Sequence, residues 1–331
     1  MGRLLCGFLL SIAMLASPCA AKNLIVPETE AQLDQRIAMF EQEARLAACD
    51  VHDRLCAMGR YKFALAALEL AQVNPECRER SCAERKSARH RAASAWWDEV
   101  RRQTGPARGD DLYDDFLMRH ANPNPAAVEA YSAQVEHDLT ASRCPETEKA
   151  CAAGRLVYVE EIDQLVRFQS FPCEAKPAGE REACMVPVGE RMQAIDALSR
   201  STLDRIVDRF GWPDEVHWGR ELQNTAWLLA QHADEDQKLQ TKFYKLIEAS
   251  FEQGYTPAVS YAYIADRQAM HQNKPQLYGT QGRCVGESDT RHWEPNPIAD
   301  ETHLNARRAA AGMEPYAQYR KITNEMCKGK P

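Results

Sequence analysis

Apolar residues recur at helical spacing along most of the chain. Between residues 28 and 47, Leu33, Ile37, Phe40 and Ala44 return every three or four positions, which places them on one face of a helix. The same periodicity predicts helices over residues 61–72, 83–102, 111–120, 125–139, 156–168, 186–210, 221–233, 235–254, 257–271, 301–311 and 315–326. Strand patterns are scarce, so we predict an all-α, multi-helix fold.

Glycine and proline mark several boundaries of these helices. Gly211, followed by Trp212 and Pro213, ends the helix 186–210. Thr256 is expected to cap the helix 257–271, because Pro257 follows it and proline suits a first helical turn. Gly312 separates the last two helices as a C-terminal cap.

Residues 272–299 interrupt the helical pattern. They contain three prolines and three glycines, and loops of this length are uncommon in compact domains and are often functional. Cys284 lies within the loop. If Cys284 bonds Cys327, the loop is tied to the C-terminus and we expect it to be ordered.

The N-terminus has the organisation of a secretory signal peptide. Residues 1–3 carry a positive charge, residues 4–16 are apolar, and small or turn-forming residues lead to a cleavage site after Ala21. The apolar run is shorter than the roughly 20 residues of a permanent membrane span. The alternative is a lipoprotein acylated on Cys19, but Pro18 fits that pattern poorly. We expect a periplasmic or secreted protein without a transmembrane segment in the mature chain.

Cysteine pairs dominate the rest of the chain. Of the twelve cysteines, Cys6 and Cys19 leave with the signal peptide, and an even, closely paired set in an exported protein indicates disulfides. The spacings do not match the C-x2-C of zinc sites, so no metal is predicted. Nearest-neighbour pairing joins Cys49 to Cys56, Cys77 to Cys82, Cys144 to Cys151, Cys173 to Cys184, and Cys284 to Cys327. A crossed hairpin, Cys49 with Cys82 and Cys56 with Cys77, is the main alternative.

One sequence motif occurs twice, 95 residues apart. The pattern C-x6-C-A-x-G-R begins at Cys49 and again at Cys144. Two cysteines seven apart on a straight helix would be about 10 Å apart, so a bond within each motif requires a loop there. We predict a signal peptide (1–21), a helical region with two cysteine-braced modules (22–185) and a C-terminal helical domain (186–331).

Charge and motifs exclude several function classes. The net charge of −7 argues against nucleic acid as the main partner. The basic stretch 85–91 lacks interleaved aromatic residues and is expected to be a solvated helix face. The chain contains no H-E-x-x-H, G-x-S-x-G, G-x-x-x-x-G-K-[ST] or G-x-G-x-x-G motif, and no cofactor is predicted.

Candidate chemistry lies in the C-terminal part. His232 stands at the edge of the apolar stripe of helix 221–233, and Asp266 lies on an otherwise apolar helix face. A buried carboxylate needs a partner, which could be His232, Arg308 or loop amides. A His–Asp pair could supply a general base and its orienting group. The alternative is a structural pair that fixes helix packing.

Several short segments of the C-terminal part resemble a known family. They are Gly211-Trp212-Pro213, Gly219, residues 227–234, Asp266-Arg267, residues 275–281, Pro297-Ile298 with Asp300, and residues 304–308 before Gly312-Met313. Through them residues 210–319 resemble an uncharacterised bacterial family, domain of unknown function 6624. The family carries no established activity, but the resemblance supports one candidate site made of His232, Asp266, Arg267, Gln276, Tyr278, Gln281 and Arg308.

Three functions remain open on these observations. The first is a polar pocket in the C-terminal domain that binds a cell-envelope ligand. The second is an envelope hydrolase with His232 as base and Asp266 as its orienter. The third is a scaffold whose cysteine modules dock another envelope protein. The pocket predicts that His232, Asp266 and Gln281 share one hydrogen-bond network, whereas the scaffold predicts an exposed apolar patch.

Overall fold

The computed structural model describes residues 29–45, 47–73, 80–104, 125–174, 176–287 and 290–328. The predicted signal peptide, the predicted helix 111–120 and the Cys77–Cys82 pair lie outside this part. Within the described residues, no helix is both long enough and apolar enough for a membrane span.

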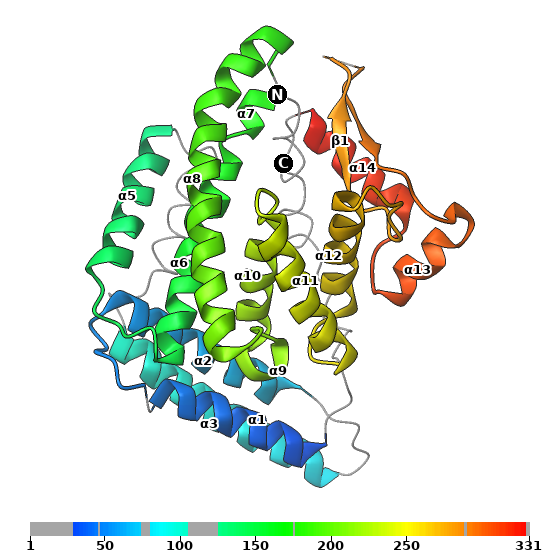
Figure 1. The fold of residues 1–331 in the computed structure, drawn as a ribbon. Helices are drawn as coiled ribbons and strands as arrows, with labels where there is room; N and C mark the ends of the chain where they lie inside the picture. The colour runs from blue at the N-terminus through cyan, green and yellow to red at the C-terminus, as the bar shows by residue number, and fades with distance from the viewer. Residues whose placement is uncertain are drawn as a thin grey trace. The chain divides into compact units, whose positions relative to one another are not determined.

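Helices make up most of the described chain, which confirms the all-α prediction (Figure 1). Most of the predicted helices are present, and several start earlier than expected. They are α1 (Glu30–Arg45), α2 (Arg54–Gln72), α3 (Arg80–Thr104), α5 (Pro125–Ala141), α6 (Lys149–Phe168), α7 (Phe171–Glu174), α8 (Ala178–Phe210), α9 (Glu215–Trp218), α10 (Arg220–Gln231), α11 (Gln237–Glu252), α12 (Ala258–His271), the 3-10 turn η4 (Glu301–His303), α13 (Leu304–Ala310) and α14 (Tyr316–Cys327).

The described chain divides into two compact units. The module unit contains Ile25–Glu161 and Thr202–Ala226, and the C-terminal unit contains Ile162–Ser201 and Trp227–Pro331. Helices α6, α8 and α10 therefore contribute residues to both. The predicted boundary near residue 185 stays a prediction.

Each unit has its own apolar core. In the module unit the predicted α1 stripe is buried, and Phe40 stacks on Phe63 with 6.1 Å between ring centroids. In the C-terminal unit Tyr319 meets Tyr263 and Trp293 edge to face, at 6.4 and 5.6 Å. Such aromatic contacts add to the free energy gained by burying the rings.

Four of the predicted disulfides are present: Cys49–Cys56, Cys144–Cys151, Cys173–Cys184 and Cys284–Cys327, each with a Cα–Cα distance of 5.5 to 5.8 Å. The crossed alternative is wrong, because Cys49 bonds Cys56. The loop required by the spacing is also confirmed. Cys49 and Cys144 precede α2 and α6, and each partner cysteine lies in the first turn of the helix.

The two modules fold alike and pack against each other reciprocally. α5 begins 95 residues after α1, and α6 begins 95 residues after α2. α2 and α6 meet at the repeated glycines. A Cβ on Gly59 would lie 1.7 Å from the Ala150 carbonyl oxygen, and a Cβ on Gly154 would lie 2.0 Å from that of Leu55. Only glycine allows this approach on either side.

Polar contacts between the two modules are also reciprocal. The Ala48 N–H donates to the carboxylate of Glu148 at 3.3 Å, and the Arg143 N–H donates to that of Asp53 at 3.0 Å. Both donors and both acceptors are 95 residues apart. The sequence repeat is therefore a structural duplication with local two-fold character.

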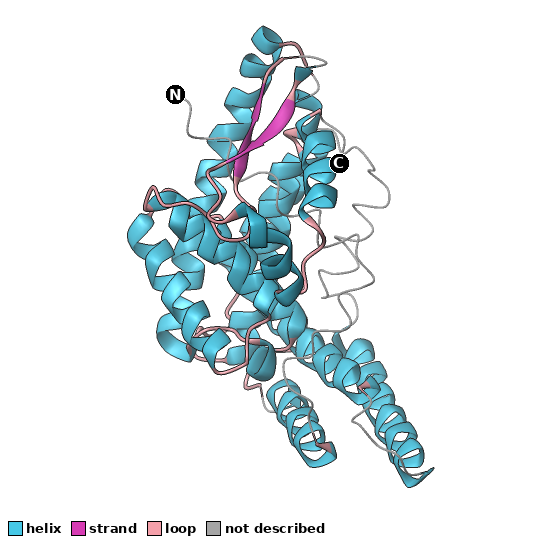
Figure 2. Cartoon of the chain, turned by 90° about the vertical axis from the view of Figure 1, so that its right-hand side faces the viewer, coloured by secondary structure: helices cyan, strands magenta, loops and turns pink. Residues whose placement is uncertain are grey.

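A two-stranded hairpin occupies the predicted long loop. β1 (Gly282–Val285) pairs antiparallel with β2 (His292–Pro295), shown in magenta in Figure 2. The Cys284–Cys327 bond joins β1 to α14, and the Trp293 N–H donates to the Asn324 side chain at 2.7 Å. The loop is ordered by these ties, as predicted, but its strands were missed.

The helix caps agree with the sequence at two of three positions. Gly211 and Gly312 have φ values of 77° and 71° and follow helix ends. The cap predicted at Thr256 is wrong. Pro257 is the capping residue, and the Thr256 hydroxyl lies 2.8 Å from that of Ser250.

Candidate functional site

His232 lies in the turn after α10, with its side chain fully buried. Its Nδ1 is 2.9 Å from a carboxylate oxygen of Asp163, which is on α6. The predicted pairing of His232 with Asp266 is therefore wrong. Among the described residues the Nε2 atom of His232 has no hydrogen-bond partner.

Arg167 completes a buried cluster of charges around Asp163. Its guanidinium pairs with Asp163 at 3.0 Å and also with Asp196 on α8. Burial would raise the pKa of Asp163, but the charge of Arg167 and the hydrogen bonds from His232 and Arg167 outweigh it and hold that pKa well below its usual range. Burial raises the pKa of Asp196 to about 7.

Burial, together with the charge of Arg167, lowers the pKa of His232. The imidazole is therefore neutral near pH 7. An ionised Asp163 can only accept a hydrogen bond, so the proton of the ring lies on Nδ1 and Nε2 carries the lone pair. This is the protonation state of a general base, but here the base is enclosed.

Asp163, Asp196 and His232 could in principle ligate a metal, because their ligand atoms lie within 4.8 Å of one another. The Arg167 guanidinium, however, already pairs with both carboxylates. A cation at this point would have to displace a buried arginine. We assign the cluster to helix packing between α6, α8 and the end of α10.

Arg267 belongs to a second polar cluster. Its Nε donates to the Gln231 side chain at 3.2 Å, and its Nη1 pairs with Asp234. His271 and Gln240 also contact the Asp234 carboxylate, at 3.2 and 2.7 Å. Burial opposes ionisation of Asp234, but Arg267 lowers the pKa of that carboxyl overall. This cluster holds the end of α10 against α11 and α12.

Asp266 is paired with loop amides, one of the three partners considered. Its carboxylate accepts the N–H groups of Leu277 at 2.7 Å, Tyr278 at 3.0 Å and Thr280 at 2.9 Å, and the Thr280 hydroxyl at 2.9 Å. Burial raises the pKa of Asp266, and these hydrogen bonds oppose the shift. The carboxylate thus shapes the turn 277–280.

The remaining predicted residues hold the same turn from other sides. Gln276 Nε2 donates to the carbonyls of Gln281 and Asn296, both at 2.8 Å. Arg308 donates to the Tyr278 carbonyl at 2.7 Å and lies over the Tyr319 ring at 4.8 Å. The Gln281 amide donates to the Thr280 hydroxyl at 3.0 Å.

The predicted site is therefore divided into three. Asp266, Gln276, Tyr278, Gln281 and Arg308 surround one ordered turn, while His232 and Arg267 belong to separate clusters. No hydrogen bond between described residues joins His232 to Asp266 or Gln281. Neither of the two hollows described below is lined by a predicted site residue.

A hollow of about 470 Å³ lies between β2 and α14 in the C-terminal unit. We call it the cationic groove. It is lined by Thr290, Arg291, His292, Ala317, Arg320, Lys321, Asn324, Glu325 and Lys328. This groove is hard to recognise in the sequence, because its charges are divided between a short strand and a helix. The i, i+4 spacing of the charges on the helix resembles that of any solvated helix face.

The module unit contains a second hollow, of about 720 Å³, with charges of both signs. Arg155, Arg205 and Arg209 line it together with Glu146 and Asp208. Arg205 pairs with Glu146 at 3.2 Å, and Arg155 donates to the Leu139 and Cys144 carbonyls at 3.3 and 3.1 Å. Because its charges are partly committed, it has less capacity for a charged ligand.

Comparison with protein families supports the resemblance seen in the sequence. The model of a family of unknown function (DUF6624) matches residues 154–329, about half of the chain. The chain belongs to this family. The match begins within the second module and includes Cys173 and Cys184, so it reaches further toward the N-terminus than the resemblance over residues 210–319. No curated protein and no solved structure matches the chain significantly.

Proposed function

We propose that this chain is an exported binding protein whose C-terminal unit binds an anionic ligand in the cationic groove. One observation carries the proposal. In a chain of net charge −7, four lysine and arginine side chains and His292 surround one hollow that contains a single carboxylate, Glu325. Clustered charge of one sign raises the local concentration of an oppositely charged ligand.

Two of the four cations are available to a ligand. Arg291 is committed to Glu174 and to the Cys327 carbonyl, and Lys328 lies 3.7 Å from Glu325. Arg320 and Lys321 are exposed, and within the described part of the chain no carboxylate pairs with either. We assign ligand contact to these two, with His292 and Asn324 as further polar neighbours.

The groove is braced before any ligand arrives. The Cys284–Cys327 bond and the Trp293–Asn324 hydrogen bond fix the hairpin against α14. A prearranged site loses less conformational entropy on binding than a flexible one. This bracing favours a binding site over an incidental group of surface charges.

Pyrophosphate and citrate are suitable probes, since they separate phosphate from carboxylate recognition. We expect calorimetry to detect binding of at least one anion, and Arg320→Glu with Lys321→Glu to weaken it at least tenfold (about 1.4 kcal/mol). Lys245→Glu, on the exposed face of α11, is the matched control. The proposal is wrong if neither anion binds, or if the control weakens binding as much as the groove variant.

The two alternatives have less support. A hydrolase would have to use His232 together with Asp163, its partner in the structure. Both side chains are almost completely buried, at 0% and 1% exposure. The scaffold requires an exposed apolar patch, and the large apolar side chains exposed in the described chain are Val186 and Leu277, which belong to different elements. Single exposed apolar residues are normal on a soluble surface.

A further inference from the structure

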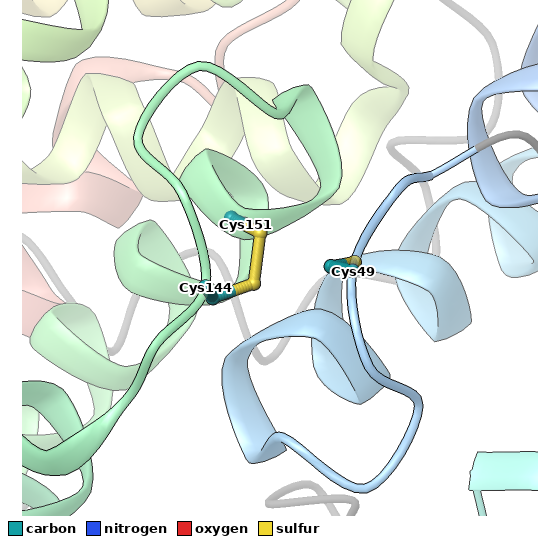
Figure 3. Close-up of side chains that lie close together, drawn as sticks. All are labelled: Cys49, Cys144 and Cys151. Carbon is teal, nitrogen blue, oxygen red and sulfur yellow. A yellow bond between two sulfur atoms is a disulfide. The ribbon is translucent and has the colours of Figure 1, made fainter.

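Two disulfides of the module unit lie next to each other. The sulfur atoms of Cys49, Cys144 and Cys151 are all within 4.8 Å of one another. In Figure 3 the bonded pair Cys144–Cys151 faces Cys49, which reaches it from the loop of the other module. The close crossing of α2 and α6 produces this arrangement, because Cys56 and Cys151 directly follow the crossing residues Leu55 and Ala150.

The four cysteine residues differ in exposure. Cys49 is part-exposed, whereas Cys144 is 4% exposed and Cys56 and Cys151 are fully buried. Disulfide exchange requires a thiolate to reach one of the bonded sulfurs. An external thiol can approach Cys49 but is shielded from the Cys144–Cys151 bond. Cys49 itself lies beside that bond.

We propose that Cys49–Cys56 and Cys144–Cys151 form a thiol–disulfide relay, in which an external dithiol attacks at Cys49 and Cys49 passes the reduction to Cys144–Cys151. The external reductant is a dithiol, either a small molecule or the paired thiols of an exported oxidoreductase. The second disulfide is reduced through the first and not directly.

The steps balance as follows. One thiolate of the dithiol bonds to the Cys49 sulfur and Cys56 leaves as a thiolate; the second thiol then closes the dithiol into a disulfide and releases Cys49 as a thiolate. Cys49 attacks Cys144 or Cys151, which breaks their mutual bond and frees the other as a thiolate. Cys56 finally attacks Cys49, re-forms Cys49–Cys56 and releases the second thiolate. Two electrons have moved from the dithiol to Cys144–Cys151.

The wild-type chain provides the first test. During partial reduction by limiting dithiothreitol, samples are trapped by alkylation, and non-reduced peptides are identified by mass spectrometry. We expect peptides that join Cys49 to Cys144 or to Cys151. Their absence at every time point, while free Cys144 and Cys151 accumulate, overturns the relay.

Variants supply a second test. In Cys56→Ser the free Cys49 thiol should form a new bond to Cys144 or Cys151 and leave the other free. Cys184→Ser is the control, because no group of three cysteine sulfurs in the described chain includes Cys173. In the double variant Cys49→Ser/Cys56→Ser, reduction of Cys144–Cys151 should slow at least tenfold, with Cys284–Cys327 as internal reference. An unchanged or faster rate in a variant with wild-type circular dichroism contradicts the proposal.

Discussion

Asp163 and Asp266 are both buried carboxylates, but different partners compensate their loss of water. Asp163 is paired with a guanidinium and an imidazole, whereas Asp266 accepts only neutral donors from one loop. A buried carboxylate without such partners is strongly unfavourable. Each aspartate therefore fixes the position of its donors, and neither is free to serve a ligand.

Replacement of Asp266 by asparagine should destabilise the protein. One oxygen becomes an NH2 group, which points a donor at the N–H of either Leu277 or Thr280 and leaves that N–H unsatisfied. We expect Asp266→Asn to lower the free energy of unfolding by about 3 kcal/mol. Asp34→Asn, which removes a surface ion pair with Arg89, should cost about 1 kcal/mol or less. Denaturant unfolding distinguishes the two, and equal losses would contradict this role of Asp266.

Glu69 should make stability depend on pH. Its burial, with the nearby charge of Glu221, raises its pKa from 4.5 to about 7. A carboxyl with a raised folded pKa stabilises the fold most below its unfolded pKa, and this contribution is lost as pH rises through about 7. We expect Glu69→Gln to match wild type near pH 4 and to exceed its unfolding free energy by roughly 1–2 kcal/mol at pH 8.

The control for that measurement is Glu129→Gln, which removes a carboxylate from the exposed surface of α5. Thermal unfolding of the three proteins between pH 4 and 8 gives the comparison. Parallel curves for wild type and Glu69→Gln would show that Glu69 does not carry this dependence.

At the residue scale, the sequence indicated which buried polar side chains need a hydrogen-bonding or charged partner, but it did not always identify that partner. The apolar face around Asp266 correctly predicted a buried carboxylate with loop amides as one possible partner. His232 was paired with the wrong aspartate because Asp163 precedes it by 69 residues. That contact depends on how α6 and α10 pack, which local periodicity does not contain.

At the scale of elements, the length of a helix or strand decided whether it could be predicted from the sequence. Helices of three or more turns repeat their apolar spacing often enough to be recognised, as in α1. β1 and β2 have four residues each, which is too short for an alternation to be distinguished from loop sequence. The Thr256 cap failed because its hydroxyl bonds Ser250 instead.

The helix crossing provides a sharp prediction. Gly59→Ala would place a methyl group 1.7 Å from a backbone oxygen, which has no rotamer by which to move away. We expect a loss of at least about 3 kcal/mol of unfolding free energy, or failure to fold. Gly189→Ala is the matched control, because nothing lies within 4 Å of its Cβ position in α8. It should stabilise by about 0.5–1 kcal/mol. Similar effects of both substitutions would contradict the crossing.

The Cys284–Cys327 disulfide, which joins β1 to α14, links stability to binding. Cys284→Ser with Cys327→Ser opens a loop of 43 residues, which should cost about 4 kcal/mol of unfolding free energy. If the brace prearranges the groove, the affinity of the variant for the anion that binds wild type should also fall, as measured by calorimetry. Cys49→Ser with Cys56→Ser should leave that affinity unchanged, since this pair lies in the module unit. Equal affinity in all three proteins would reject prearrangement.

At the scale of the whole molecule, the repeated motif and the family match divide the chain differently. The family spans residues 154–329 and so begins at the second copy of the repeated glycine, within a helix that contributes to both compact units. The duplication could be predicted from the sequence because the same cysteine and glycine positions occur in both copies of the motif. The cationic groove could not be predicted, because charged residues occupy most exposed helix faces.

The reciprocal contacts of the two modules have a consequence for their history. A single module has no partner of its own for the surface around its glycine, yet a second identical polypeptide would supply one, as in a symmetric homodimer. After fusion into one chain, the sequence of each module could change independently of the other. Ser142 already shows such a change: its hydroxyl bonds Asp53 at 2.9 Å, whereas the matching position in the first module is Ala47. The two modules therefore share a fold but no longer make identical contacts.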